Sequence, residues 1–180
     1  MWEILESADA QRILPKLPKE IRAKYEKWQD IVRFGGPSNL RVIRGFRDEA
    51  LSGAWEGYRS SRLNLQWRVI YFVENDKISV TVEKVTPHRL SEVAMAKRKK
   101  YSPAKRYAHL SIGEGLRVLR ELQEMTQAEL AAESGVPQAA ISALENGRLS
   151  LGLERAKKLA RALKVHPAVI AFPDWDYRAA

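Results

Sequence analysis

Residues 126–148 constrain the fold of this chain more than any other stretch. Thr126 and Glu129 form a capping box, in which the two side chains satisfy free backbone amides at the start of a helix. Gly135 follows where the chain must turn sharply, which glycine does without steric cost, and a second helix is predicted from Pro137 to Asn146. The apolar positions shared by the two helices are Leu130, Ala131, Val136, Ile141 and Leu144. This spacing is typical of a helix-turn-helix.

The segments on either side predict three more helices, so residues 111–180 should form an all-α domain of five helices. Ser111 and Glu114 make a second capping box, and leucines recur on one face of the helix that they open. Ser150 is placed to cap a fourth helix over residues 151–163. A short fifth helix follows.

The first turn of the second helix in such a pair faces the major groove of DNA, so its exposed side chains are candidates for contact with bases. Gln138 can bond adenine through two hydrogen bonds, and the methyl group of Ala139 can contact thymine. At the start of the first helix, Gln127 and the neighbouring backbone amides can bind a phosphate. The predicted DNA-binding residues are Gln127, Gln138, Ala139, Ser142, Asn146 and Arg148.

This half resembles the XRE family of helix-turn-helix proteins, the Cro/cI-like group, over residues 111–172. The resemblance implies binding to operator DNA as a homodimer. A second interpretation stays open, a five-helix domain that keeps the fold without binding DNA, because Ala139 and Ala140 offer few polar contacts to bases. The matching residues are Thr126-Gln127, Leu130-Ala131, Gly135-Val136, Gln138, Ile141-Ser142 and Glu145-Asn146-Gly147-Arg148.

The net charge of the chain points to a polyanionic partner. Its 180 residues include 31 basic and 22 acidic side chains, a net charge of +9, and nucleic acid is the common partner of such proteins. The chain has no cysteine, which excludes disulfides and thiolate metal sites, and its three histidines lie far apart, so no metal or other cofactor is expected. Without a long apolar run or a signal-peptide pattern, we expect a cytoplasmic protein that makes no membrane contact.

The first half of the chain has a different pattern, with two helices followed by strands. Helices are predicted over residues 8–14 and 19–33. The second helix should bury the face that carries Ile21, Tyr25, Trp28 and Val32. Strands are predicted at residues 2–5, 40–43, 58–65, 67–73 and 78–85. Two helices beside a mainly antiparallel sheet give an α+β domain, predicted to occupy residues 1–93.

Residues 94–110 are predicted to be a basic linker between the two domains. They lack apolar periodicity and contain the run Lys97-Arg98-Lys99-Lys100, followed by Lys105 and Arg106. The helix-turn-helix domain then occupies residues 111–180.

Arginines in the predicted strands suggest a surface that binds phosphate, because the guanidinium group can bond two oxygens at once. Metal-free cleavage of RNA needs such cations, together with a base for the ribose 2′-OH and an acid for the leaving oxygen. His88, after the last strand, suits proton transfer at neutral pH. If residues 64–66 form a hairpin turn, Arg59 and Arg68 are expected to converge on one surface.

This half resembles the RelE/HigB family of toxin ribonucleases, within the RelE/ParE superfamily, over residues 2–90. Such toxins cut messenger RNA on the ribosome, so the resemblance implies a metal-independent endoribonuclease. It assigns phosphate binding to Arg68 and acid–base chemistry to His88. The accessory residues that it implies are Arg62, Arg59, Lys84, and Glu49 or Asp48 as a base. The resemblance rests on the paired helices, Leu51-Ser-Gly-Ala-Trp55, Ser61-Arg62-Leu63-Asn64, Arg68-Val69-Ile70-Tyr71 and Thr86-Pro87-His88.

Each of these residues also has a structural explanation. An arginine on a strand commonly lies on a solvated face, and a single histidine is commonly a surface residue. Trp55, Tyr58 and Trp67 fit a buried core as well as they fit stacking on bases. The functional interpretation therefore depends on the combination of residues.

The order of the two halves predicts a type II toxin–antitoxin pair in one chain. A ribosome-dependent mRNA endonuclease would be restrained by a HigA-type antitoxin domain that also represses its own promoter. Two alternatives stay open, a transcription regulator whose toxin-like domain serves only dimerisation or sensing, and a gyrase poison of the ParE kind on the same fold. Arg68 and His88 favour the ribonuclease, because gyrase poisoning needs no acid–base set.

Overall fold

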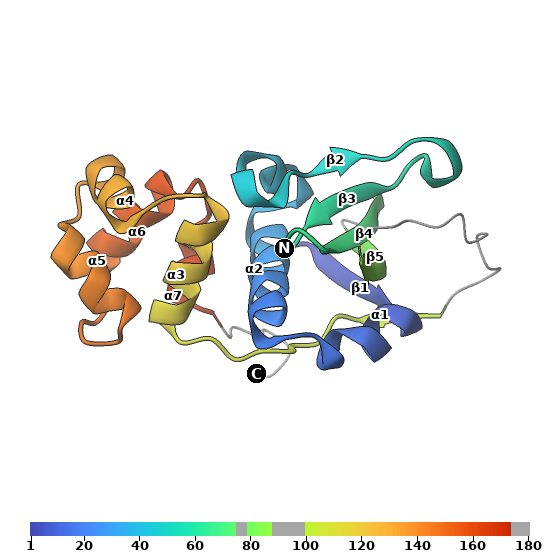
Figure 1. Ribbon diagram of the computed structural model, residues 1–180, viewed down its shortest axis with the longest axis horizontal. Helices are drawn as coiled ribbons and strands as arrows, with labels where there is room; N and C mark the ends of the chain where they lie inside the picture. The colour runs from blue at the N-terminus through green and yellow to red at the C-terminus, as the bar shows by residue number, and fades with distance from the viewer. Residues whose placement is uncertain (75–78, 88–99, 174–180) are drawn as a thin grey trace.

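The N-terminal half is an α+β unit built on a mixed sheet (Figure 1). The structure is a computed structural model and describes residues 1–74, 79–87 and 100–173. The strands are β1 (Glu3–Ser7), β2 (Glu49–Ala50), β3 (Arg59–Arg62), β4 (Trp67–Glu74), β5 (Ser79–Pro87) and β6 (Tyr101–Pro103). Among these strands the order is β2-β3-β4-β5-β1-β6, and all neighbours are antiparallel except β1 and β5. The predicted fold class, α+β followed by all-α, is confirmed.

Helix α2 (Lys19–Gly35) is the central element of the fold, and α1 (Ala8–Ile13) precedes it. The four apolar residues predicted to be buried on α2 are at most 4% exposed. Trp28 meets Tyr71 of β4 edge to face, with 5.2 Å between the ring centres. One face of the sheet, the α2 face, is therefore covered by this helix.

Residues 40–43, predicted as a strand, lie instead in the 3-10 helix η2 (Pro37–Val42) and at its end, and η3 (Arg44–Phe46) follows. Leu40, Ile43 and Phe46 are buried. They recur every three residues, which is the period of a 3-10 helix, so the strand prediction used the wrong period.

Residues 100–110 are held against the N-terminal half, which differs from the predicted linker. β6 pairs with β1, and the Ala104 amide donates to the Ile4 carbonyl at 2.8 Å. Arg106 forms ion pairs with Glu26 and Asp30 of α2. A three-residue strand and long-range ion pairs leave no periodic pattern in the sequence, which is why the prediction missed them. The first part of the predicted linker, including Lys97–Lys99, lies outside the described residues.

The helical half contains α3 (Ile112–Leu122), α4 (Gln127–Ser134), α5 (Gln138–Glu145), α6 (Leu153–Ala162) and α7 (Ala168–Ala171). Both predicted capping boxes are confirmed, at Ser111 and at Thr126. The predicted cap of the fourth helix is wrong. Gly152 occupies the N-cap of α6, because its carbonyl accepts the first helical hydrogen bond, from Ala156 at 2.9 Å, and Ser150 lies two residues too early.

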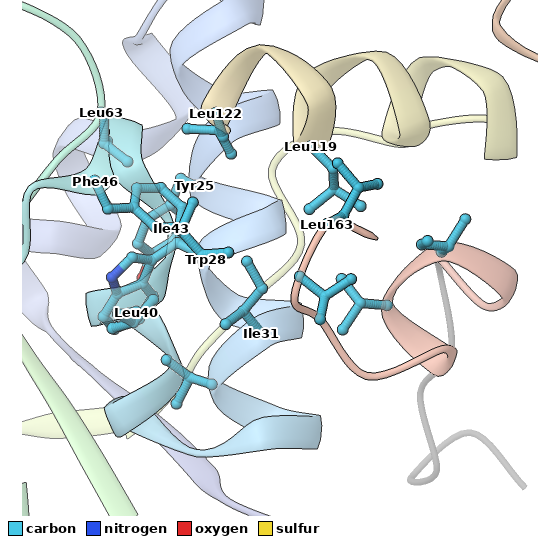
Figure 2. Close-up of a cluster of buried hydrophobic side chains, with 14 of the residues drawn as sticks. Tyr25, Trp28, Ile31, Leu40, Ile43, Phe46, Leu63, Leu119, Leu122 and Leu163 are labelled. Atoms are coloured by element: carbon cyan, nitrogen blue, oxygen red, sulfur yellow. The ribbon is translucent and has the colours of Figure 1, made fainter. Parts of the chain in front are cut away.

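One hydrophobic core runs through both halves of the chain. Helix α2 lies between the sheet and the helical half (Figure 1), and α3 and α7 pack against it. Figure 2 shows side chains of α2, η2 and η3 gathered with leucines of the helical half. Residues of this shared core include Tyr25, Trp28, Ile31, Leu40, Leu119, Leu122 and Leu163. Because burial of a large apolar side chain contributes about 1.5–3 kcal/mol, the contact holds the halves firmly together.

Charged side chains are buried at the same contact. Lys27 and Asp30 of α2 form an ion pair at 2.9 Å, and neither side chain has exposed surface. Lys27 Nζ also donates to the Val169 carbonyl of α7 at 3.1 Å, and Arg106 pairs with Asp30 at 2.7 Å. A buried charge is tolerated only with such partners, so this network fixes α7 and the connecting segment on α2.

Candidate nucleic-acid interfaces

Helices α4 and α5 form the predicted helix-turn-helix, at the end of the molecule away from the sheet (Figure 1). Gly135 between them has a φ of 66°, the left-handed conformation that glycine adopts freely. Helix α5 rests closely on α3, since a β carbon at Gly113 would lie 2.3 Å from the Leu144 carbonyl oxygen. This packing leaves Gln138 and Ala139, in the first turn of α5, exposed to solvent.

The six predicted DNA-binding residues all lie on α4, α5 or the turn after α5, but they differ in solvent exposure and in hydrogen bonding. Gln138, Ala139 and Arg148 are exposed, and Ser142 is half-buried. Asn146 Nδ2 donates to the Ser142 carbonyl at 2.7 Å. Gln127 Nε2 donates to Glu145 at 2.9 Å, which orients the glutamine at the start of α4.

Glu145 of α5 joins this helix to α3 and α4, a role that was not predicted from the sequence. Arg120 of α3 binds its carboxylate with two hydrogen bonds, of 2.7 and 2.9 Å. Burial acts to raise the pKa of Glu145, but the hydrogen bonds from Arg120 and Gln127 outweigh it and lower the pKa. Arg120 and Gln127 lie 25 and 18 residues before Glu145 in the sequence. No local sequence pattern therefore predicts these hydrogen bonds.

Acidification should release this contact. The pKa of Glu145 is lower in the folded chain than in the unfolded chain. The ionised carboxylate therefore contributes its full share of the unfolding free energy above the ordinary glutamate pKa, and this contribution is lost as the pH falls through the lowered pKa. Glu145→Gln should cost about 1.5–3 kcal/mol at neutral pH, as expected for a hydrogen bond to a charged group. It should also flatten the dependence of unfolding free energy on pH below about 4.3. Urea unfolding across this range measures both effects, with the exposed Glu133→Gln as control, and equal pH dependence in both variants would contradict the assignment.

Four of the predicted catalytic residues, one each from β2, β3, β4 and β5, lie on the face of the sheet opposite α2, the outer face. Directly paired residues on neighbouring strands point to the same side, and residues along a strand alternate. Arg62 pairs with Arg68, so both lie on one face. Lys84 pairs with Ile70, two residues beyond Arg68, and therefore lies on that face as well. Glu49 joins them, because it pairs with Ser60, the partner of Ile70.

Arg68 has two side-chain hydrogen-bond partners on this face. Its Nη1 lies 2.7 Å from Glu49 Oε1 and 2.9 Å from Ser60 Oγ. The arginine side chain is 12% exposed and the Glu49 side chain 56% exposed, so the carboxylate can be displaced by an incoming anion. Arg62 Nε is buried and has no hydrogen-bond partner within the described residues. The outer face thus holds two arginines at directly paired positions and one exposed carboxylate.

Arg59 does not join this group, contrary to the prediction from the hairpin. Residues 64–66 do connect β3 and β4, but Arg59 pairs with Tyr71 and so lies on the α2 face. Its guanidinium binds Asp48, which also accepts hydrogen bonds from Ser61 and Tyr71. Arg59 also lines a separate cavity of about 420 Å³. The Asp48 carboxylate is therefore hydrogen-bonded on the α2 face, away from Arg68. Glu49 is the acidic residue beside Arg68.

His88, the predicted acid or base, lies outside the described residues. The strand that leads to it, β5, ends at Pro87. Thr86 pairs with Arg68, so the chain leaves the sheet close to the arginine pair. The role of His88 stays a prediction.

A row of aromatic rings lies on the outer face, and the sequence predicted only part of it. Trp55 meets Tyr58 at 5.3 Å, Tyr58 meets Phe72 at 5.2 Å, and Phe72 meets Tyr101 at 6.3 Å between ring centres. All four are half-buried. Trp67, in contrast, packs against the core. Phe72 and Tyr101 were missed because their neighbours come from strands that are distant in sequence.

Over residues 1–74, 79–87 and 100–173, no group of three or more His, Asp or Glu side chains is arranged to hold a metal ion. In the same part of the chain, no helix has the length and apolar character needed to cross a membrane.

The helical half matches a known family. A model of the helix-turn-helix family matches residues 116–170. The HTH-type transcriptional repressor RghR of Bacillus subtilis (strain 168) is 48% identical over 56 residues, which are 31% of this chain and 42% of that protein. The chain therefore spans less than half the length of this relative. Residues 116–170 are a helix-turn-helix of the XRE type, as the sequence predicted.

Two solved structures are similar to parts of the chain. The restriction-modification controller protein C.AhdI from Aeromonas hydrophila is 32% identical, with 33% of this chain and 89% of that chain covered and a TM-score of 0.32. The YoeB/ParE toxin from Agrobacterium tumefaciens is 18% identical, with 48% and 99% covered and a TM-score of 0.39. At TM-scores below 0.5, neither likeness assigns a function.

Proposed function

We propose that this chain is a type II toxin–antitoxin pair in a single polypeptide, whose helical half binds operator DNA. The observation that supports DNA binding is the exposed first turn of α5, held by the α3 and α4 contacts at the end of the molecule farthest from the sheet (Figure 1). The N-terminal half does not cover this turn, so a major groove can reach it in the intact chain. Two copies would bind an inverted repeat, with half-sites one helical turn or a multiple of it apart, and repress the promoter of the chain itself.

Gln138→Ala should relax the sequence preference of the intact chain. Loss of a two-point contact to a base costs about 1–3 kcal/mol on the preferred site and little on random DNA. Fluorescence anisotropy with selected and scrambled duplexes measures the ratio of the two affinities. Gln66→Ala, an exposed glutamine of the N-terminal half, is the matched control and should leave the ratio unchanged. An equal loss of affinity on both duplexes would remove Gln138 from base recognition.

The N-terminal half is proposed to cleave messenger RNA on the ribosome. The supporting observation is the direct pairing of Arg62 with Arg68 across two strands. Like charges opposite each other on a sheet are destabilising, so an anionic ligand on the outer face would be bound favourably. The row of aromatic rings beside them offers surfaces on which unstacked bases can lie.

We infer the following chemistry for this face. Glu49 would take the proton from the ribose 2′-OH, whose oxygen attacks the adjacent phosphorus. Arg68 and Arg62 would stabilise the negative charge that develops on the phosphorane oxygens. His88 would protonate the departing 5′ oxygen, which leaves a 2′,3′-cyclic phosphate. Lys84, on the same face, would add positive charge for the RNA backbone.

Restraint of the nuclease is proposed to be steric. The helical half packs on the α2 side, and the arginine pair lies on the opposite face of the sheet. The helical half therefore leaves the arginine pair uncovered but adds residues 111–180 to the body that must approach the ribosome. An inactive toxin-like module in a transcription regulator would give no cleavage with or without the helical half, and a gyrase poison would break DNA instead of messenger RNA.

A further inference from the structure

The 3-10 segment of the N-terminal half packs directly on the corner between α3 and α4. A β carbon at Gly45 would lie 2.7 Å from the Leu122 carbonyl oxygen, so the two backbones are in close contact. Gln123 joins them further, because its Oε1 accepts from the Arg44 amide at 3.3 Å and its Nε2 donates to the Val42 carbonyl at 3.4 Å. Gln123 Nε2 also donates to the Leu163 carbonyl at 2.7 Å, which anchors the corner in the helical half. The segment is thus fixed relative to the helix-turn-helix.

Two arginines of this segment lie beside the start of α4. Arg47 pairs with Glu124, in the turn before α4, at 3.5 Å, and its side chain is 60% exposed. Arg44 is exposed as well. Its backbone amide bonds Gln123, only three residues before Thr126, the N-cap of α4, so Arg44 lies beside the same corner of the fold. Both cations therefore border the helix end at which a phosphate is expected.

The helix-turn-helix itself has little positive charge to offer. Residues 111–172 contain eight basic and seven acidic side chains. Affinity for duplex DNA depends largely on cations that neutralise phosphates. A DNA-binding domain that is almost neutral needs such cations from elsewhere.

We propose that Arg44 and Arg47 of the toxin-like half contact the DNA backbone, so that the DNA-binding surface of this chain extends across both halves. The partner is duplex DNA, and the contact is to phosphate, so it adds affinity without sequence preference. This inference rests on the proposed DNA binding by α4 and α5. It implies that the two halves cannot separate without a loss of affinity for DNA.

The salt dependence of DNA binding by the intact chain tests the inference. The probe is a labelled mixed-sequence duplex about three helical turns long, titrated at several salt concentrations. Each lost phosphate contact reduces the slope of log affinity against log salt by about 0.9, so Arg44→Gln with Arg47→Gln should reduce it by about 1.8. Arg44→Lys with Arg47→Lys keeps both charges and should keep the slope. Arg12→Gln with Lys16→Gln removes the same charge at α1 and η1 (Leu14–Lys16), distant from α4, and should also keep it.

The outcomes separate this inference from the function on which it rests. If the intact wild-type chain does not bind the duplex, the proposed DNA binding fails. If it binds, and the glutamine variant has the wild-type slope, Arg44 and Arg47 do not contact phosphate. An equal reduction in the Arg12 and Lys16 variant would also overturn the inference, because net charge alone would then explain the effect. Melting temperatures of all variants confirm that each remains folded.

Discussion

Replacing Asp30 by alanine should lower the free energy of unfolding of the whole chain by about 3–5 kcal/mol, because it leaves a buried charge without its partner. Lys27 Nζ lies 2.9 Å from the Asp30 carboxylate, and neither side chain is exposed. After the substitution, Lys27 would keep only the Val169 carbonyl. Arg106 would lose one of its two carboxylate partners and keep Glu26. Urea unfolding followed by tryptophan fluorescence and circular dichroism measures the loss.

The matched control for this variant is Asp9→Ala. Asp9 pairs with Arg12 at 3.2 Å, but the two side chains are 53% and 70% exposed. Exposed pairs of this kind contribute about 0–1 kcal/mol. Because the buried network and the hydrophobic core both join the halves, wild type should unfold in one transition. Two separate transitions, or equal small losses in the two variants, would contradict the shared core.

Replacing Arg68 by alanine should reduce cleavage of messenger RNA by about 10²–10³-fold, the usual cost of removing one group that stabilises transition-state charge. The reduction is measured by primer extension on translating ribosomes in a purified system. Arg12→Ala, on α1 and away from the arginine pair, is the control and should cleave at the parent rate. Cleavage by Arg68→Ala at the parent rate, in a protein with the parent circular dichroism spectrum, would remove Arg68 from the mechanism.

The toxin fragment for such assays should end at residue 110. The sequence alone places the boundary at 93, but residues 101–107 complete the N-terminal half. Tyr107 donates to Glu6 at 2.6 Å, and the Tyr107 amide donates to Glu26. Glu6 is fully buried and Glu26 is 1% exposed. A fragment cut at 93 would leave both carboxylates buried without these donors, and loss of activity would then report misfolding.

The parts of the fold that could be predicted from the sequence are those set by neighbouring residues. Ser111 and Thr126 cap their helices because the partner glutamate lies only three residues away. Gly135 turns the chain because no other residue adopts its conformation at so little cost. The apolar spacing of α2 predicted its buried face. The spacing of apolar and polar positions likewise predicted that the start of α5 is exposed.

The parts that could not be predicted depend on residues far apart in the chain. Whether Arg59 or Arg62 faces Arg68 is decided by the register of β3 on β4, and a shift of one residue exchanges the two faces. The burial of Lys27 and Asp30 has no local signal either, because Arg106 and Val169, more than 70 residues away, supply their partners. The contact of Arg44 with the α3–α4 corner has no sequence signal for the same reason.

Mapping of messenger RNA ends in cells that express residues 1–110, the intact chain, or neither tests most directly whether one polypeptide holds a toxin and its restraint. The fragment should stop growth and produce new 5′ ends within translated messages, and the intact chain should produce few. Co-expression of residues 111–180 should suppress the ends made by the fragment. Equal cleavage by the fragment and the intact chain would contradict the restraint. The absence of new ends with a folded fragment would contradict the ribonuclease and leave a DNA-binding regulator.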